Sequence, residues 1–448
     1  MILHNFHFSN FDAFGYQAEE TVHSVHLDRK QRLWIGSEKG LHLFDGTRVT
    51  TFEGKEDSPE DIPHYFAKAI TETPQGDIWI GTWGGGITRF NEVSRSFFKP
   101  DLTKAGQSHT GFDQKVWSLE SDEKGRIWIG SFTTGLFRYS PDADQIINAY
   151  AAAPGEVQQY NRIQAIHADK KGRIWFAPSG KPVRVIDADT LELEFEIKPP
   201  PELDTHPRLR TVDDIAPVPG SNHVMIAYDR GLVRIVSSEG DVVHEFKLDR
   251  MPPESSIMEA LPLSDSAALI GSGSQLWYLN LESGDHFAIP NGEWKGAIPK
   301  TIIWDMDLSD TGDILIAGTT GVWIQPYSSR QFWTIFQGGE EPSKLHEARA
   351  ISRIRDSLYV NNGSDIFEIP NFPKGLDRPK KLESFRRVSD PDTRALSLIG
   401  KEGWGFWGAS DEESFYLDHN YKLQPITPSL RATHTMLLDE EFRPFSGR

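Results

Sequence analysis

The chain repeats one segment along its length, and this repeat restricts the possible folds more than any other feature of the sequence. Four copies align without gaps and share a central tryptophan: VHSVHLDRKQRLWIGSEKGLHLFD (22–45), AKAITETPQGDIWIGTWGGGITRF (67–90), VWSLESDEKGRIWIGSFTTGLFRY (116–139) and IQAIHADKKGRIWFAPSGKPVRVI (163–186). Weaker copies begin at residues 212, 257, 303, 348 and 395, and part of another follows at residue 433. The copies recur about every 47 residues, the length of a four-stranded propeller blade. Helical repeats of similar length would need apolar residues at the helical spacing, which these copies lack.

Each copy predicts three strands joined by tight turns. In the third copy the strands cover residues 116–119, 126–130 and 136–139, and the turns end at Gly125 and Gly135. Glycine suits such turns because they require a left-handed backbone. A fourth, more polar strand should lie in each connection, so the fold class is an all-β propeller of four-stranded blades.

Two positions of the repeat fit the geometry of a ring of sheets. Inner strands crowd near the central axis, where small side chains fit, and the tryptophan further out would fill the widening gap between blades. The small residues on the first strand are Ser24, Ala69, Ser118, Ala165, Ala350 and Ser397.

The copies share the consensus V-x-[SA]-[IL]-x-x-D-x-x-G-x-[IL]-W-I-G-[ST]-x-x-G-L-x-R-[FY]. This consensus resembles the two-component regulator propeller repeat, and the resemblance covers nearly the whole chain. It implies a ligand-sensing portion of a hybrid two-component sensor or a related membrane signalling protein of bacteria. Such portions are usually periplasmic and typically hold two seven-bladed propellers, followed by an immunoglobulin-like domain, a membrane span and an output domain. The resemblance therefore implies a periplasmic location, and a cytoplasmic location is the alternative because no signal peptide is visible.

The repeat count predicts the domain organisation. Seven copies end near residue 328, so we expect a seven-bladed propeller over residues 1–328. A strand over residues 6–8, from Phe6 to Phe8, would close its seventh blade. Residues 329–448 would form two to three further blades, the truncated start of a second propeller. We therefore expect a fragment or a shortened relative of a two-propeller sensor.

Composition excludes several classes of function. Lys and Arg number 47 against 65 Asp and Glu, which gives a net charge of −18. The chain therefore lacks the excess of basic residues that a nucleic-acid binder needs. No apolar run reaches the ~18 residues of a membrane span. The absence of cysteine removes disulfides, thiolate nucleophiles and Cys-ligated zinc.

Six residues are candidates for ligand binding, and each has an alternative structural role. Trp83 and Phe132 follow predicted second strands and either stack on a sugar ring or pack on a neighbouring blade. Trp117 and Trp304, on first strands, either line the mouth of the central channel or belong to the core between blades. His64 and Tyr65 lie in a connection that could reach one face of the propeller.

No motif for metal binding or catalysis stands out. Asp305, Asp307, Asp310 and Asp313 suggest a calcium loop, but glycine is misplaced and the last glutamate is missing, so we interpret them as an inner strand and its turn. We expect no cofactor and no metal. His-Glu-x-x-His, P-loop and Gly-x-Ser-x-Gly motifs are absent from the sequence.

Three functions remain open. The favoured one is a non-catalytic sensor module that binds an oligosaccharide or another small ligand. A second is a scaffold that binds a protein partner, or forms a homodimer, through a propeller face. A third is a propeller lyase or glycosidase, which would need carboxylates or histidines with shifted pKa values clustered at the channel mouth.

Overall fold

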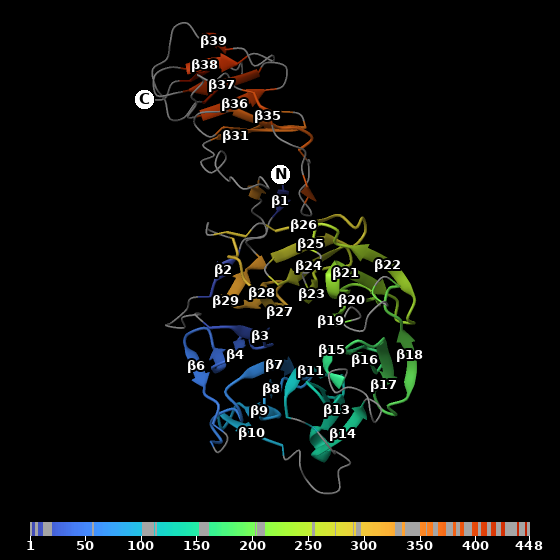
Figure 1. Cartoon of the computed structure of the whole chain (residues 1–448). Coiled ribbons are helices and arrows are strands. Elements are labelled where there is room, and N and C mark those ends of the chain that lie inside the picture. Colours follow the sequence, from blue (N-terminus) through green and yellow to red (C-terminus); the bar gives the residue numbers. More distant parts are fainter. Residues whose placement is uncertain are drawn as a thin grey trace. The chain divides into compact units, whose positions relative to one another are not determined.

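The protein was analysed as a computed structural model (Figure 1), which describes residues 2–4, 8–11, 20–55, 58–100, 112, 114–151, 161–201, 203, 211–252, 256–273, 275–289, 291–292, 297–327, 334–336, 350–354, 356–361, 366–372, 380–381, 386–388, 397–401, 405–409, 414–417, 423–425, 437–438 and 444–445. The chain forms two compact units. One comprises Phe6–Arg330, and the other comprises Met1–Asn5 with Gln331–Arg448. The sequence placed the boundary at residue 328 and kept the first five residues with the larger unit.

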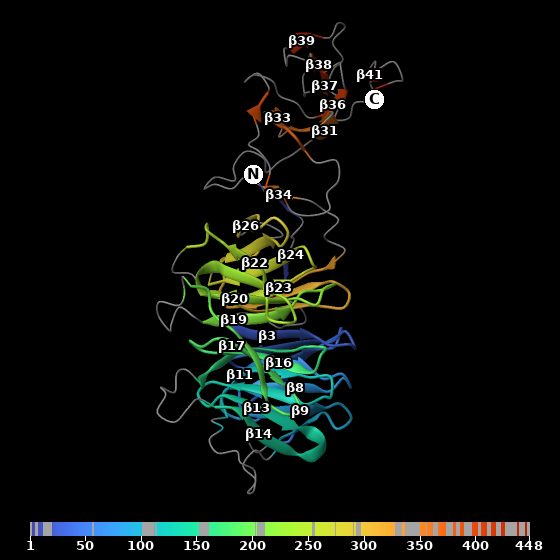
Figure 2. The same cartoon turned by 90° about the vertical axis from the view of Figure 1, so that its right-hand side faces the viewer.

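The larger unit is a ring of seven four-stranded antiparallel sheets, which confirms the predicted propeller fold (Figures 1 and 2). From the inner to the outer strand, the first three blades are β3 (Val22–Leu27), β4 (Leu33–Ser37), β5 (Gly40–Phe44) and β6 (Val49–Phe52); β7 (Ala67–Glu72), β8 (Ile78–Thr82), β9 (Ile87–Asn91) and β10 (Ser96–Phe98); and β11 (Val116–Ser121), β12 (Ile127–Ser131), β13 (Leu136–Ser140) and β14 (Gln145–Tyr150). The fourth and fifth are β15 (Ile163–Ala168), β16 (Arg173–Pro178), β17 (Val183–Asp187) and β18 (Leu193–Ile197); and β19 (Val212–Pro217), β20 (Val224–Tyr228), β21 (Leu232–Val236) and β22 (Val242–Lys247). The sixth is β23 (Ile257–Pro262), β24 (Ala267–Ser272), β25 (Gln275–Asn280) and β26 (His286–Ala288).

The N-terminal part of the chain closes the ring. The seventh blade consists of β27 (Ile303–Leu308), β28 (Ile314–Gly318), β29 (Gly321–Gln325) and, as its outermost strand, β2 (Ser9–Asn10). The backbone N–H of Phe11 extends this pairing by donating to the Val322 carbonyl over 2.8 Å. Because β27 also contacts β3, the first and last blades meet.

The closing strand differs from the predicted one. The sequence placed it at residues 6–8, of which Phe6 and His7 lie outside the described residues, whereas the structure has it at Ser9–Asn10. An outermost strand has one exposed edge, so polar residues suit it better than aromatic ones. The residues directly before and after the strand, Phe8 and Phe11, have buried side chains.

The repeated tryptophans fill the gaps between blades, as predicted. Trp34, Trp79, Trp128 and Trp175 are fully buried. Trp34, on the first blade, packs in one hydrophobic cluster with Ile78 and Ile80 of the second. The other three tryptophans contact the following blade in the same way.

An aspartate in the first hairpin turn holds each of three tryptophans in place. In the third blade the Asp122 carboxylate accepts a 2.9 Å hydrogen bond from the Trp128 indole and a 2.6 Å bond from the Arg126 guanidinium. The first and fourth blades repeat this arrangement. In the second blade Thr73 replaces the aspartate, and the buried indole nitrogen of Trp79 has no hydrogen-bond partner. The Asp-x-x-x-Arg-x-Trp part of the repeat therefore stabilises the fold.

The smaller unit is also built from strands. It contains a sheet of β30 (Thr334–Phe336), β1 (Ile2–His4) and β34 (Lys380–Lys381), and two four-stranded sheets. These are β31 (Ala350–Ile354), β32 (Ser357–Asn361), β33 (Ile366–Ile369) and β35 (Arg386–Arg387), and β36 (Ser397–Lys401), β37 (Gly405–Ala409), β38 (Ser414–Leu417) and β39 (Leu423–Pro425), beside a hairpin of β40 (Leu437–Leu438) and β41 (Pro444–Phe445). Within the residues that the structure describes, no helix has the length and apolar character needed to cross a membrane.

Candidate functional site

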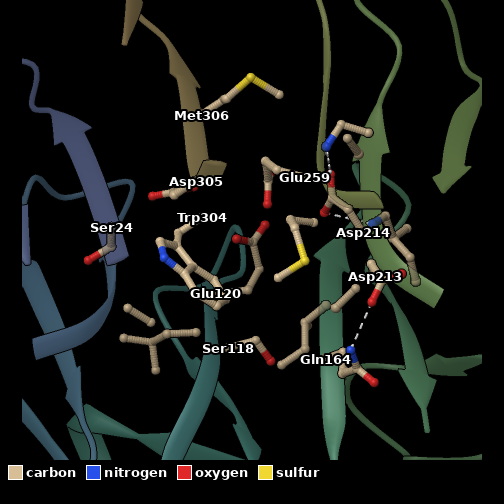
Figure 3. A pocket seen from close by; sticks show the side chains of 18 of the residues that line it. Ser24, Ser118, Glu120, Gln164, Asp213, Asp214, Glu259, Trp304, Asp305 and Met306 are labelled. Atoms are coloured by element: carbon tan, nitrogen blue, oxygen red, sulfur yellow. Dashed lines mark hydrogen bonds between the residues drawn. The ribbon is translucent and has the colours of Figure 1, made fainter. Parts of the chain in front are cut away.

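The innermost strands of all seven blades enclose a central channel with a cavity of about 380 Å³ (Figure 3). Every blade contributes to its lining, from His23 on the first to Asp307 on the seventh. The rest of each blade stands outside this ring and buries its own apolar residues, so the channel walls rest on rigid sheets.

A β-bulge near the start of the inner strands helps to direct the side chain of the second residue toward the channel. In β11, Val116 pairs with Ser131 and Ser118 pairs with Gly130, so Trp117 has no partner on β12. The same shift occurs in every inner strand except β15, where it spans Ile163 to Ile166. A bulge leaves one residue unpaired and re-aims its side chain. The second residues of the inner strands all line the cavity: His23, Lys68, Trp117, Gln164, Asp213, Met258 and Trp304.

The bulge resolves the alternatives left open for two candidate residues. The sequence assigned Trp117 and Trp304 either to the channel or to the core between blades. Both line the cavity and both remain partly exposed. Simple strand alternation does not reveal a bulge, so the sequence offered no signal for this choice.

Three of the candidate aromatics contact one another, and we refer to Trp83, Trp117 and Phe132 as the aromatic cluster. The ring centroids of Trp83 and Phe132 are 4.7 Å apart, and that of Trp117 lies 5.7 Å from Trp83 and 5.6 Å from Phe132. Trp83 and Phe132 follow β8 and β12 directly. Their backbone N–H groups donate to the carbonyls of Phe66 and Lys115, the residues before β7 and β11. The rings thus pack between neighbouring blades, as the structural interpretation expected, and stay partly exposed; stacking on a sugar remains a prediction.

The remaining candidates lie around this cluster. His64 stacks on Tyr65 at 4.3 Å, and a Cβ atom on Gly84 would lie 3.2 Å from the His64 ring, so His64 lies against the glycine loop after Trp83. The Tyr65 side chain is 55% exposed. Trp304 lies 4.9 Å from the His23 ring, on the seventh and first blades.

Two cations, which the sequence analysis did not single out, lie over the aromatic faces. The Lys68 ammonium is 5.0 Å from the Trp117 ring centroid and 5.6 Å from that of Trp304. The Arg162 guanidinium carbon is 5.1 Å from the ring centroids of both Trp117 and Phe132. Such placement is attractive because the ring face carries negative charge. Burial lowers the pKa of both cations.

Three acids occupy the position at which the sequence predicted small residues. On the first four blades this third residue of the inner strand is serine or alanine, whereas the last three blades have Asp214, Glu259 and Asp305 (Figure 3). Burial raises the pKa of Asp214 to about 6 and that of Asp305 to about 7, and it holds the pKa of Glu259 well above its usual range. The break in the small-residue pattern was the available signal for this cluster.

Hydrogen bonds hold these acids in the wall of the channel. Asp214 accepts from the backbone N–H groups of Ile215 and Ala260, at 2.7 and 3.2 Å, and its carboxyl group hydrogen-bonds that of Glu259. Asp305 accepts from the Val25 N–H at 2.8 Å. Two carboxyl groups in such contact cannot both ionise easily, so the pair retains a proton.

Further titratable groups lie on the inner strands. Burial raises the pKa of Glu120 to about 7 and lowers that of His167 to about 4. Burial also opposes the charge of His26, but hydrogen bonds to Asp307 (3.0 Å) and Glu72 (3.4 Å) outweigh it and raise the His26 pKa to about 10.

The described residues contain no group of three or more His, Asp or Glu side chains placed to hold a metal ion. In the segment with the spacing of a calcium loop, Asp313 accepts hydrogen bonds from the Tyr327 backbone N–H and the Thr311 hydroxyl, both at 2.7 Å. These bonds fit the interpretation of the segment as a strand and its turn.

Residues 61–84 match the family model of the two-component regulator propeller. Among solved structures, the chain is similar to the extracellular domain of a putative hybrid two-component system from B. thetaiotaomicron, with 14% identity and a TM-score of 0.68 over 94% of this chain and 54% of that one. It is also similar to the extracellular domain of a putative one-component system from B. thetaiotaomicron, with 15% identity and a TM-score of 0.55 over 93% of this chain and 53% of that one. The streptogramin B lyase structure has 12% identity and a TM-score of 0.55 over 72% of this chain and 97% of its own.

The chain therefore spans about half the length of the two extracellular domains. No curated protein sequence is significantly similar to it. Identities this low show the fold alone, because one fold hosts many functions. The predicted resemblance is confirmed at the level of the repeat and the ring: the larger unit of this chain is a seven-bladed β-propeller that carries the two-component regulator propeller repeat at residues 61–84.

Proposed function

We propose that this chain is a non-catalytic ligand-sensing module of a bacterial signal-transduction protein. It binds an oligosaccharide or another small ligand at the mouth of the channel and passes the change to an output domain. The aromatic cluster carries this proposal, since its rings are partly exposed beside a cavity of about 380 Å³. The repeat and the fold shared with extracellular domains of signalling systems support it, and they favour the periplasm as its location.

The size and lining of the channel suit a sugar. Its cavity of about 380 Å³ lies near the lower end of the roughly 300–1,000 Å³ usual for small-molecule pockets. It would therefore admit one end of an oligosaccharide rather than a whole chain. Aromatic faces contact the C–H groups of a sugar, while Gln164 and Asp213 supply hydrogen-bonding groups in the channel wall.

The test is calorimetry of the full chain with a panel of oligosaccharides. We expect at least one to bind, and we expect Trp83→Ala and Trp117→Ala each to weaken that binding about tenfold or more, as loss of a buried aromatic contact does. Phe98→Ala, which removes a 41% exposed ring on β10, is the matched control. Absence of binding across the panel, or unchanged affinity in both tryptophan variants, would contradict the proposal.

A second candidate function is that of a propeller lyase or glycosidase, and the acids of the channel favour it. Such an enzyme needs one protonated carboxyl group and one ionised group close together. The hydrogen-bonded pair of Asp214 and Glu259, with Glu120 and Asp305 in the same cavity, meets the requirement set out from the sequence.

Product analysis separates the two functions. The purified chain is incubated with polysaccharides, and new reducing ends and unsaturated products are measured. Turnover that disappears in both Asp214→Asn and Glu259→Gln would establish the enzyme and overturn the sensor. Binding without turnover supports the sensor.

We also propose that the two four-stranded sheets of the smaller unit are blades of a second propeller. Their first strands, β31 and β36, contact each other as the inner strands of neighbouring blades do in the ring. An experimental structure in which these sheets pack face to face, as in a sandwich, would contradict this assignment.

A further inference from the structure

We propose that the ligand bound at the channel mouth carries an anionic group, a carboxylate or a sulfate, that binds at Lys68 and Arg162 beside Trp117. This inference rests on the proposed function and specifies the charge of the ligand at the same site.

The first observation is that, among the described residues, neither the Lys68 nor the Arg162 charged group has an ion-pair or hydrogen-bond partner, whereas Arg126, Arg173 and Arg234 form ion pairs and Arg138 donates to the Ala188 carbonyl. Arg126 lies 2.6 Å from Asp122, Arg173 lies 2.6 Å from Asp169, and Arg234 lies 2.6 Å from Glu245. In the part of the chain that the structure describes, no carboxylate lies within ion-pair distance of Lys68 or Arg162. No hydrogen bond to either charged group is present there, and the buried Nε atom of Arg162 has no partner.

An unpaired charge that is partly removed from water is unfavourable, and attraction to an aromatic face offsets only part of that loss. The lowered pKa of each cation reflects this environment. The chain has 65 acidic residues against 47 basic ones, so carboxylate partners are abundant. Two cations left without one at the mouth of a cavity indicate that the partner comes with the ligand.

The second observation is the geometry. Lys68 is the second residue of β7 and lines the cavity, and Arg162 directly precedes β15. Both charged groups lie about equally far from the Trp117 ring, at 5.0 and 5.1 Å. Both charged groups therefore lie next to the same indole, so the site presents N–H groups as well as ring faces. An oxyanion can accept charge-assisted hydrogen bonds from both side chains.

Burial weakens the opposition of the channel acids to this positive charge. Asp305 and Glu259 act on Lys68 through space, and Asp213 acts on Arg162. Burial raises the pKa of all three carboxyl groups, so they are less ionised near neutral pH than exposed carboxyls. His23 also faces Lys68, and burial together with the lysine charge lowers its pKa to about 4, so its ring is neutral.

The experiment uses pairs of oligosaccharides in which one member carries acidic groups and the other is neutral. Trigalacturonate is paired with galactotriose, cellobiouronate with cellobiose, and a sulfated galactotriose with the unsulfated sugar, each titrated into the full chain by calorimetry. We expect the anionic member of a pair to bind at least about tenfold more tightly, with an affinity that falls as salt rises. If only neutral sugars bind, this inference is wrong while the proposed function stands. If no sugar binds, the proposed oligosaccharide-sensing function fails and this inference with it.

Variants test the two cations directly. Lys68→Met and Arg162→Gln should each weaken anion binding about tenfold and change neutral-sugar binding less than twofold. The control is Lys170→Gln, which changes an exposed lysine after the other end of β15 and should alter neither affinity.

A measurement of stability without ligand completes the test. Because an unpaired cation is unfavourable, Arg162→Gln should leave Tm unchanged or raise it, whereas Arg173→Gln, which breaks an ion pair of the same blade, should lower it. An Arg162→Gln variant that loses as much Tm as Arg173→Gln would assign Arg162 a structural role and overturn the proposal.

Discussion

Replacing Asp305 with asparagine should make the ring more stable than the wild-type chain at pH 8. Asp305 is the third residue of β27 and lines the channel, where its carboxylate accepts the Val25 N–H at 2.8 Å. Burial is the main cause that raises its pKa from 3.8 to about 7. Nearby Asp307 and Asp214 raise the pKa further, whereas the Val25 hydrogen bond and Lys68 lower it.

The magnitude follows from the difference between the two pKa values. Each pKa unit corresponds to about 1.4 kcal/mol, so ionising Asp305 in the folded state costs up to about 4 kcal/mol more than in the unfolded chain. The folded pKa lies above the unfolded value. The wild-type free energy of unfolding therefore has its full contribution from protonated Asp305 below about pH 4, and this contribution is lost as the pH rises through about 7. Asparagine cannot ionise, and its amide oxygen still accepts the Val25 N–H.

Urea unfolding followed by tryptophan fluorescence at pH 4, 5, 6, 7 and 8 measures the effect. The free energy of unfolding of Asp305→Asn should exceed that of the wild type by up to about 4 kcal/mol at pH 8, and the difference should approach zero near pH 4. Asp310→Asn, in the exposed turn after β27, controls for the loss of one negative charge. A difference that is constant across this range, or a variant less stable at pH 8, would refute the reasoning.

Three further changes test the fold around the site. Asp122→Ala should cost about 2–3 kcal/mol of unfolding free energy in urea, because the buried Trp128 indole loses its acceptor; an effect below about 0.5 kcal/mol would contradict the role of the aspartate. Phe11→Ala should lower the free energy of unfolding by about 3–4 kcal/mol and increase light scattering on heating, because the buried Phe11 side chain lies beside the strand that closes the ring. An unchanged Tm would contradict closure of the ring by β2. His26→Gln should destabilise the ring more at pH 6 than at pH 10. The pKa of His26 in the folded chain is about 10, above the ordinary 6.5, so the stability that its charge provides is lost as the pH rises through 10; a loss of unfolding free energy that grows with pH would contradict the Asp307 ion pair.

The blade and the ring could be predicted from the sequence because the information that specifies them is local. A turn glycine such as Gly125, an aspartate six residues before a tryptophan, and small residues on the inner strand recur within one repeat. The interactions they make are local too, since the Asp122 carboxylate reaches Arg126 and Trp128 within one hairpin. Local patterns of this kind predict the fold from the sequence alone, including the tryptophans between blades.

Which side chains meet in the channel depends on tertiary contacts that the repeat pattern does not show. The bulge that directs Trp117 and Trp304 into the cavity depends on the pairing of two strands, and strand alternation does not record it. Closure of the ring brings Lys68 of the second blade against Trp304 of the seventh, which are far apart in the sequence. Packing of the last three blades brings their acids together in the channel wall, where burial raises the pKa of each carboxyl group. The chemistry of the channel is therefore a property of the closed ring, because each blade supplies only one wall of it.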